Sequence, residues 1–351
     1  MHSYLMIKKK TSWKHKLAAI LFSCLVILIV VLLGELACRM FTRIQFLETS
    51  RYLFTPRRFG ISFGNTPNLE AMLMSARINI DENGFRYDPE FRSAAPPDAP
   101  TILIVGDSVP FGPGVAEKYT MASLMSHALP NERIYNLAVP GYDTFDYKNV
   151  TDIVVSQKPN IKTVLLFYCL NDVSNVSAEQ IRAQTETFED PDKPKEAQSL
   201  SRRINDYLRT RSKLYLWLRS WLYDSSKNYF LSDTAFYFNK DDEALKPAWQ
   251  PLADLNESLT RSGIKFKVFL MPYEAQVRPN TPPEYLKPQE RVAKFLKEHN
   301  IDYYDATPDF KQAKAPDELF ILGDPMHLSA DGHRIAAQVM CKEIEEKCTI
   351  Q

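Results

Sequence analysis

The chain has 351 residues, of which 45% are hydrophobic, 12% aromatic and 25% charged. This composition is typical of a globular protein and excludes a disordered or fibrous one. Basic and acidic side chains number 43 each, so the overall charge does not indicate nucleic acid as a partner.

An apolar segment lies close to the N-terminus. Residues 17–33 are apolar except for Ser23, and the residues before them include five lysines and no acidic side chain. With Gly34 the segment is short for a membrane span but long for the core of a cleaved signal peptide. We therefore expect a basic cytoplasmic tail at 1–16 and a transmembrane signal anchor at 17–34.

Two other interpretations of this segment stay open. A buried core helix is disfavoured because the segment has no polar face. Cleavage and lipidation at Cys38 would follow the pattern of bacterial lipoproteins, because Ala37 precedes the cysteine. Glu35, however, stands where those proteins have an aliphatic residue.

The charges that flank the span predict its orientation. The lysines before it outnumber Arg39, Arg43 and Arg51 after it, so the positive-inside rule places the N-terminus in the cytoplasm. The expected protein is a single-pass protein of the bacterial inner membrane, with its large domain on the periplasmic or extracytoplasmic side.

Beyond the span, residues 35–100 are expected to form an irregular juxtamembrane extension that ends in a proline-rich linker. From residue 101 onward, apolar strand patterns alternate with helical patterns. Strands are predicted at 101–105, 133–138, 163–168, 265–271 and 301–305. This alternation predicts an α/β domain over 101–348, with a parallel sheet and helices on both faces.

One stretch interrupts the alternation. Residues 176–248 separate two strands by more than a crossover helix requires, so we expect an insertion. Its first part, 186–196, is acidic and is expected to be an exposed loop. Its second part, 207–222, is basic and aromatic and predicts one amphipathic helix. This helix either packs on the domain, rests on the membrane surface or covers the site.

Ser108 is the candidate nucleophile. It follows the buried strand 101–105 after Gly106, which permits a sharp turn, and ligands of parallel α/β sheets bind at the carboxyl ends of the strands. A serine nucleophile needs a base and a group that orients the base. His327 and Asp324, three residues apart, offer both, although the same loop also looks like the cap of a helix that begins near Ser329.

Two other features of the C-terminal part bear on this assignment. His333 competes with His327 as the base, but it falls inside the predicted helix and is disfavoured. Cys341 and Cys348 lie roughly 10 Å apart along a continuous helix, too far for a disulfide unless the helix ends first, so we do not expect that bridge.

Four segments resemble, in order, the sequence blocks of the SGNH (GDSL-type) hydrolase superfamily. They are Gly106-Asp107-Ser108, Asn136-Leu137-Ala138-Val139-Pro140-Gly141, Asn171-Asp172 and Asp324-Pro325-Met326-His327. The resemblance covers about residues 101–345, and the N-terminal part is similar to the extensions of membrane-tethered bacterial members. It implies a flavodoxin-like three-layer α/β/α fold without a metal or organic cofactor.

The resemblance also implies the roles of the site residues. Ser108 would be the nucleophile, His327 the base and Asp324 its orienting group, while the backbone amides of Ser108 and Gly141 and the side chain of Asn171 would form the oxyanion hole. The chain departs from the family pattern at Cys169, where glycine is usual, and at Val109, where leucine is usual. Cys169 puts the placement of Asn171 in question, and Asn171-Asp172 alone would also fit a simple turn.

The expected function is a membrane-anchored serine ester hydrolase that acts on an acyl ester of the cell envelope, such as an O-acetyl group on a glycan. Two alternatives stay open. An O-acyltransferase would use the same acyl-enzyme and pass the group to a sugar hydroxyl. A non-catalytic envelope assembly protein would share only the fold.

Overall fold

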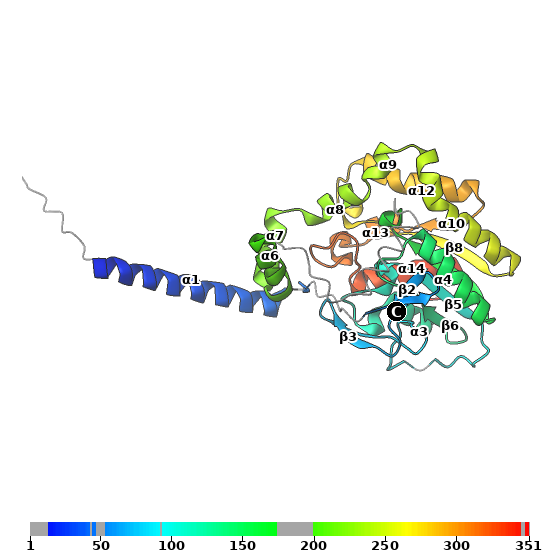
Figure 1. Ribbon diagram of the computed structural model, residues 1–351, viewed down its shortest axis with the longest axis horizontal. Coiled ribbons are helices and arrows are strands. Elements are labelled where there is room, and N and C mark those ends of the chain that lie inside the picture. Colours follow the sequence, from blue (N-terminus) through cyan, green and yellow to red (C-terminus); the bar gives the residue numbers. More distant parts are fainter. Residues whose placement is uncertain are drawn as a thin grey trace, which may run out of the picture.

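The computed structural model describes residues 13–42, 44–46, 53–91, 93–173, 199–344 and 348–350 (Figure 1). Helix α1 (Trp13–Phe41) extends away from the rest of the described chain. It encloses the predicted span, its apolar side chains are exposed, and an 18-residue window reaches a mean hydropathy of 3.1. The helix is therefore long and apolar enough to cross a membrane.

Within the described residues, a parallel five-stranded sheet has the order β6-β5-β7-β8-β9. Its strands are β5 (Thr101–Gly106), β6 (Arg133–Asn136), β7 (Ile161–Tyr168), β8 (Lys265–Leu270) and β9 (Asp302–Asp305). Each strand coincides with a predicted one to within a few residues. The α/β fold with a parallel sheet is confirmed.

Helices cover both faces of this sheet (Figure 1). Strand β5 shows why, because Leu103 and Val105 join the core on one face while Ile102 and Ile104 join the core on the other. The first core packs under α4 (Thr144–Gln157), α10 (Asp242–Arg261) and α12 (Lys287–Glu298). The second packs under α3 (Met121–Ala128), α13 (Thr307–Gln312) and α14 (Ala330–Ile344).

Short elements connect these layers. The α-helical ones are α2 (Ser108–Phe111), α8 (Ser225–Asp233), α9 (Ala235–Asn239) and α11 (Glu274–Val277). The 3-10 turns are η1 (Glu117–Tyr119), η2 (Leu170–Asp172), η3 (Pro283–Leu286) and η4 (Pro316–Leu319). Of these, α2 and η2 directly follow sheet strands and position the site.

The segment before the sheet is more ordered than the sequence analysis expected. It forms two antiparallel hairpins, from β1 (Phe54–Phe59) with β2 (Ser62–Asn65) and from β3 (Glu70–Leu73) with β4 (Ala76–Asn79). Strands this short carry little alternation that a sequence pattern could reveal. Phe59 and Phe85 enter the core of the sheet, and the Arg86 amide donates to the Asn136 carbonyl (3.0 Å). The segment therefore packs directly on the α/β unit.

The single helix predicted over 207–222 is wrong. Two helices occupy this part, α6 (Leu200–Arg211) and α7 (Lys213–Leu222), and both lie at the C-terminal end of α1 (Figure 1). The break falls at Ser212, which has extended backbone and whose hydroxyl accepts a hydrogen bond from the Tyr215 amide (3.0 Å) as an N-cap. The expected acidic loop at 186–196 lies outside the described residues.

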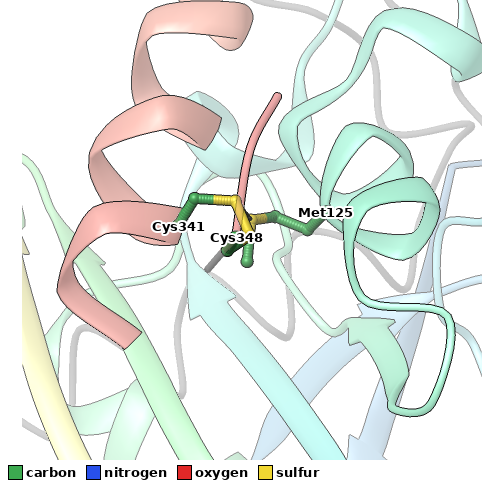
Figure 2. The surroundings of a disulfide bond; sticks show 3 residues. All are labelled: Met125, Cys341 and Cys348. Carbon is green, nitrogen blue, oxygen red and sulfur yellow. Dashed lines mark hydrogen bonds between the residues drawn. A yellow bond between two sulfur atoms is a disulfide. The ribbon is translucent and has the colours of Figure 1, made fainter. Parts of the chain in front are cut away.

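The prediction that Cys341 and Cys348 stay unbridged is also wrong. Helix α14 ends at Ile344, before Cys348, so the two Cα atoms lie only 5.0 Å apart and the sulfurs are bonded. Figure 2 shows the bridge beside Met125 of α3, whose Sδ lies 3.7 Å from Cys341 Sγ. The disulfide thus joins the end of the described chain to the core between α3 and α14.

Candidate active site

Ser108 is the first residue of α2, directly after β5. Gly106 allows this turn, because a Cβ at that position would lie 2.4 Å from Pro110 Cγ and 3.0 Å from the Phe167 carbonyl oxygen. Asp107 caps the new helix, since its Oδ1 accepts a hydrogen bond from the Val109 amide (2.8 Å). The nucleophile candidate is therefore held on a rigid turn at the carboxyl edge of the sheet.

The loop before α14 brings His327 to this serine. Asp324 Oδ1 accepts hydrogen bonds from the amides of Met326 (3.0 Å) and His327 (2.8 Å), which shapes the loop. Asp324 Oδ2 lies 2.7 Å from His327 Nδ1, and His327 Nε2 lies 2.8 Å from Ser108 Oγ. Three side chains from two ends of the domain thus form one continuous hydrogen-bonded series.

The electrostatics of the pair favour a basic imidazole. Burial disfavours the charged ring, but the carboxylate of Asp324 outweighs it and raises the pKa of His327. Burial likewise opposes the charge on Asp324, but the adjacent imidazole and the hydrogen bonds from the loop hold the pKa of this carboxyl below its ordinary value. Asp324 thus stays ionised and can stabilise a proton on His327.

Gly141 and Asn171 follow the two strands that flank β5 in the sheet. Gly141 has φ +89°, a conformation that favours glycine, and the loop that carries it is tied to β5 by a hydrogen bond from the Val139 amide to the Gly106 carbonyl (3.0 Å). Asn171 lies in η2, and its buried Oδ1 has no hydrogen-bond partner among the described residues. Ser108, Gly141 and Asn171 therefore follow three adjacent strands at one edge of the sheet.

Cys169 does not disturb this arrangement. It adopts extended backbone with φ −100°, so the position does not require glycine, and its amide donates to Asp172 Oδ2 (2.7 Å). Burial raises the pKa of the Cys169 thiol well above its ordinary value, and the nearby charges of Asp107 and Asp172 add to the effect. Cys169 is therefore a buried, unreactive thiol beneath the turn that carries Asn171.

His333 has a different environment from His327. It is fully buried in α14, where its Nδ1 accepts a hydrogen bond from the Met121 amide (3.2 Å). Burial, together with the positive charge of Arg86, lowers the pKa of this imidazole to about 3. His333 is therefore a neutral core residue.

Arg86 is a supporting residue that the sequence analysis missed. Its side chain is almost fully buried, donates to the carbonyls of Phe111 and Gly112 at the end of α2, and pairs with Glu117 (2.7 Å). Glu117 in turn accepts hydrogen bonds from Asn79. Arg86 thus fixes the C-terminal end of the helix that Ser108 begins, a role that no local pattern around it indicates.

A cavity of about 280 Å³ opens beside the site. Asp324 and His327 line it together with side chains of α6, α7 and α8. Among residues that the structure describes, no group of three or more His, Cys, Asp or Glu side chains could hold a metal ion. His327 and Asp324 are thus exposed to this cavity.

The fold and site define an α/β ester hydrolase. The sequence profile of the GDSL-like lipase/acylhydrolase family matches residues 104–335, which include Ser108, Gly141, Asn171, Asp324 and His327. Because this match covers more than half of the chain, the protein belongs to the GDSL-like lipase/acylhydrolase family. It is a hydrolase that acts on esters.

Solved structures of low sequence identity are similar to this chain. A lipase/acylhydrolase from Enterococcus faecalis is 14% identical, covers 72% of this chain and 98% of its own, and has a TM-score of 0.42. The acetylxylan esterase Axe2 from Geobacillus stearothermophilus is 13% identical, with coverages of 74% and 100% and a TM-score of 0.42. A G-D-S-L family protein from Veillonella parvula is 13% identical, with coverages of 71% and 99% and a TM-score of 0.40. No curated protein matches the chain.

Proposed function

We propose that the protein is a membrane-anchored serine esterase that removes an acyl group, such as an O-acetyl group, from an ester of the bacterial cell envelope. The observation that carries the proposal is the hydrogen-bonded series from Ser108 Oγ through His327 to Asp324, with separations of 2.8 and 2.7 Å. This series opens onto a cavity on the His327 side. A nucleophile, a base and a group that orients the base are the three parts of a triad that forms an acyl-enzyme.

The reaction proceeds in two halves. His327 Nε2 takes the proton of the Ser108 hydroxyl as Oγ attacks the acyl carbon, and Asp324 stabilises the imidazolium through Nδ1. Collapse of the tetrahedral intermediate breaks the ester bond, and His327 returns the proton to the leaving alkoxide. In the second half, His327 deprotonates a water molecule that attacks the acyl carbon. The acyl–Oγ bond then breaks, the imidazolium returns this proton to Ser108 Oγ, and the carboxylic acid leaves.

Charge that develops on the carbonyl oxygen needs hydrogen-bond donors. We assign this role to the amides of Ser108 and Gly141 and to the carboxamide of Asn171, because all three follow adjacent strands β5, β6 and β7. Gly141 has a positive φ and no Cβ, which permits a close approach of the substrate to its backbone amide. Donors of this kind typically contribute about 100- to 1000-fold to the rate.

Two features support a position outside the cytoplasm. Helix α1 is long and apolar enough to span a bilayer, and the lysines precede it. The Cys341–Cys348 disulfide fits an oxidising compartment such as the bacterial periplasm. A protease added to spheroplasts should therefore digest the catalytic domain, and an untouched domain in intact spheroplasts would contradict this topology.

The reaction itself is tested with full-length protein in detergent micelles. We expect release of acetate from 4-nitrophenyl acetate and from an O-acetylated oligosaccharide, and no release by Ser108→Ala. The same assay with unacetylated oligosaccharide as acceptor counts transferred acetyl groups. Transfer that exceeds acetate release would show an acyltransferase instead, and the absence of both would contradict the proposal.

A further inference from the structure

The cavity beside His327 has a basic wall made by α6 and α7. The segment 200–223 contains six arginine or lysine residues and a single acidic one. Two of the arginines, Arg209 of α6 and Arg219 of α7, line the same cavity of about 280 Å³ as His327. Positive side chains and the base of the site therefore border one space.

Neither arginine is neutralised within the part of the chain that the structure describes. Arg209 Nε is buried without a hydrogen-bond partner there, and no ion pair of the described residues includes Arg209 or Arg219. The Arg219 guanidinium lies over the ring of Tyr223, 5.4 Å from its centroid, which orients the group but leaves its charge. Partly buried cations are normally paired, so these two are placed to receive an anion.

Two acidic side chains, Asp324 and Asp233, also line this cavity. Asp324 accepts from His327, as described above, and Asp233 accepts a hydrogen bond from the Tyr273 hydroxyl (3.0 Å). Asp233 lies on α8 and Asp324 on the loop before α14, and neither forms an ion pair with Arg209 or Arg219 among the described residues. Within the described residues, α6 and α7 thus supply to the cavity two arginines that no carboxylate pairs with.

This wall is held in place by the end of α1. Glu35 accepts hydrogen bonds from the amides of Lys213 (3.1 Å) and Leu214 (3.0 Å) and from the Ser212 hydroxyl (2.8 Å), at the N-terminus of α7. Arg39 donates to the Arg211 carbonyl (2.8 Å), at the C-terminus of α6. Each charge faces the helix end of opposite partial charge, so α1 fixes the two helices that carry the arginines.

We propose that Arg209 and Arg219 form a subsite for a carboxylate or phosphate group on the alcohol part of the ester substrate. A guanidinium recognises either oxyanion through two parallel N–H donors, which gives orientation as well as affinity. The cavity is near the lower limit of about 300 Å³ for small-molecule sites, which suits one anionic unit of a larger molecule. This inference rests on the proposed esterase function and specifies its substrate class.

The test measures binding to full-length Ser108→Ala in detergent, because α1 holds the wall and the variant does not consume the ligand. Two matched pairs are compared by calorimetry: O-acetylated methyl glucuronide with O-acetylated methyl glucoside, and acetylglycerol phosphate with acetylglycerol. We expect the anionic member of at least one pair to bind about tenfold tighter or more, since a charged hydrogen bond contributes that much. The pair that shows the preference identifies the oxyanion.

Substitutions then identify the side chains that cause the preference for the anionic ligand. Arg209→Gln or Arg219→Gln should reduce the preference for the anionic ligand about tenfold, and Arg209→Lys should retain part of this preference. Arg203→Gln, on the exposed face of α6, is the control and should leave the preference unchanged. Equal affinities within both pairs, or a preference that survives both Gln substitutions, would overturn the subsite. If the wild-type protein hydrolysed no ester but the anion preference followed these substitutions, the esterase function would fail and the anion subsite would stand.

Discussion

The two sides of the catalytic cavity are built in different ways. On the sheet side, each reactive residue is positioned by its own neighbours, since Ser108 follows β5 and Asp324 shapes the loop that carries His327. On the other side, α6 and α7 depend on Glu35 and Arg39, which are 172–179 residues away in the chain. The residues of the proposed chemistry are therefore held locally at the sheet edge, whereas the wall formed by α6 and α7 depends on α1.

The largest effect is expected on the sheet side, from Asp324→Asn. Loss of the carboxylate should lower kcat/KM about 10⁴-fold, as in comparable triads, because the imidazole loses its orientation and its stabilised proton. In the wild type, activity should rise with pH through a pKa above the ordinary value of 6.5, since Asp324 raises the pKa of His327 and only the neutral ring acts as a base. In Asp324→Asn, the midpoint of this rise should move to a lower pH than in the wild type. An unchanged midpoint would argue against the pairing of Asp324 with His327.

A second change on the same side is Asn171→Ala. We expect kcat to fall about 100- to 1000-fold with a small change in KM, because the lost donor acts on the transition state. Asn149→Ala is a matched control, since that amide donates to the Phe59 carbonyl (2.8 Å) away from the site. A loss confined to KM would indicate that Asn171 binds substrate instead.

A smaller effect is expected on the α1 side, from Glu35→Ala. The variant removes the acceptor for two amides of α7, and a lost helix cap costs about 1 kcal/mol, or about fivefold in local opening. Trypsin should therefore cleave at Arg211 and Lys213 about fivefold faster in micelles. Glu70→Ala, on exposed β3, serves as the control. Equal cleavage rates for Glu35→Ala and the wild type would contradict the docking role of α1.

The smallest effect on activity is expected from Cys348→Ser, which lies on neither side of the cavity. The bridge links two cysteines that are seven residues apart in the chain. Its loss should lower the free energy of unfolding by about 2 kcal/mol. Denaturant unfolding checks this, with Cys24→Ser on α1 as the control. An unchanged free energy of unfolding in Cys348→Ser, or an equal loss in Cys24→Ser, would contradict this role of the bridge.

Much of the sheet side was predictable from the sequence. Buried strands are short apolar runs, and their carboxyl ends place Ser108, Gly141 and Asn171 at one edge by topology alone. The break at Ser212 was missed because the apolar and basic pattern of 207–222 continues across it, and its cause is a polar contact with distant Glu35. The disulfide was missed because the sequence between Lys342 and Cys348 contains no glycine or proline that would indicate the end of the helix.

The central claim is that Ser108 is a nucleophile activated by His327. Full-length protein in detergent is treated with a fluorophosphonate probe, which labels activated serines, and the modified peptide is identified by mass spectrometry. We predict labelling at Ser108, loss of labelling in Ser108→Ala and His327→Ala, and unchanged labelling in Ser156→Ala on the exposed face of α4. Unlabelled wild-type protein, or labelling that persists in His327→Ala, would contradict the account.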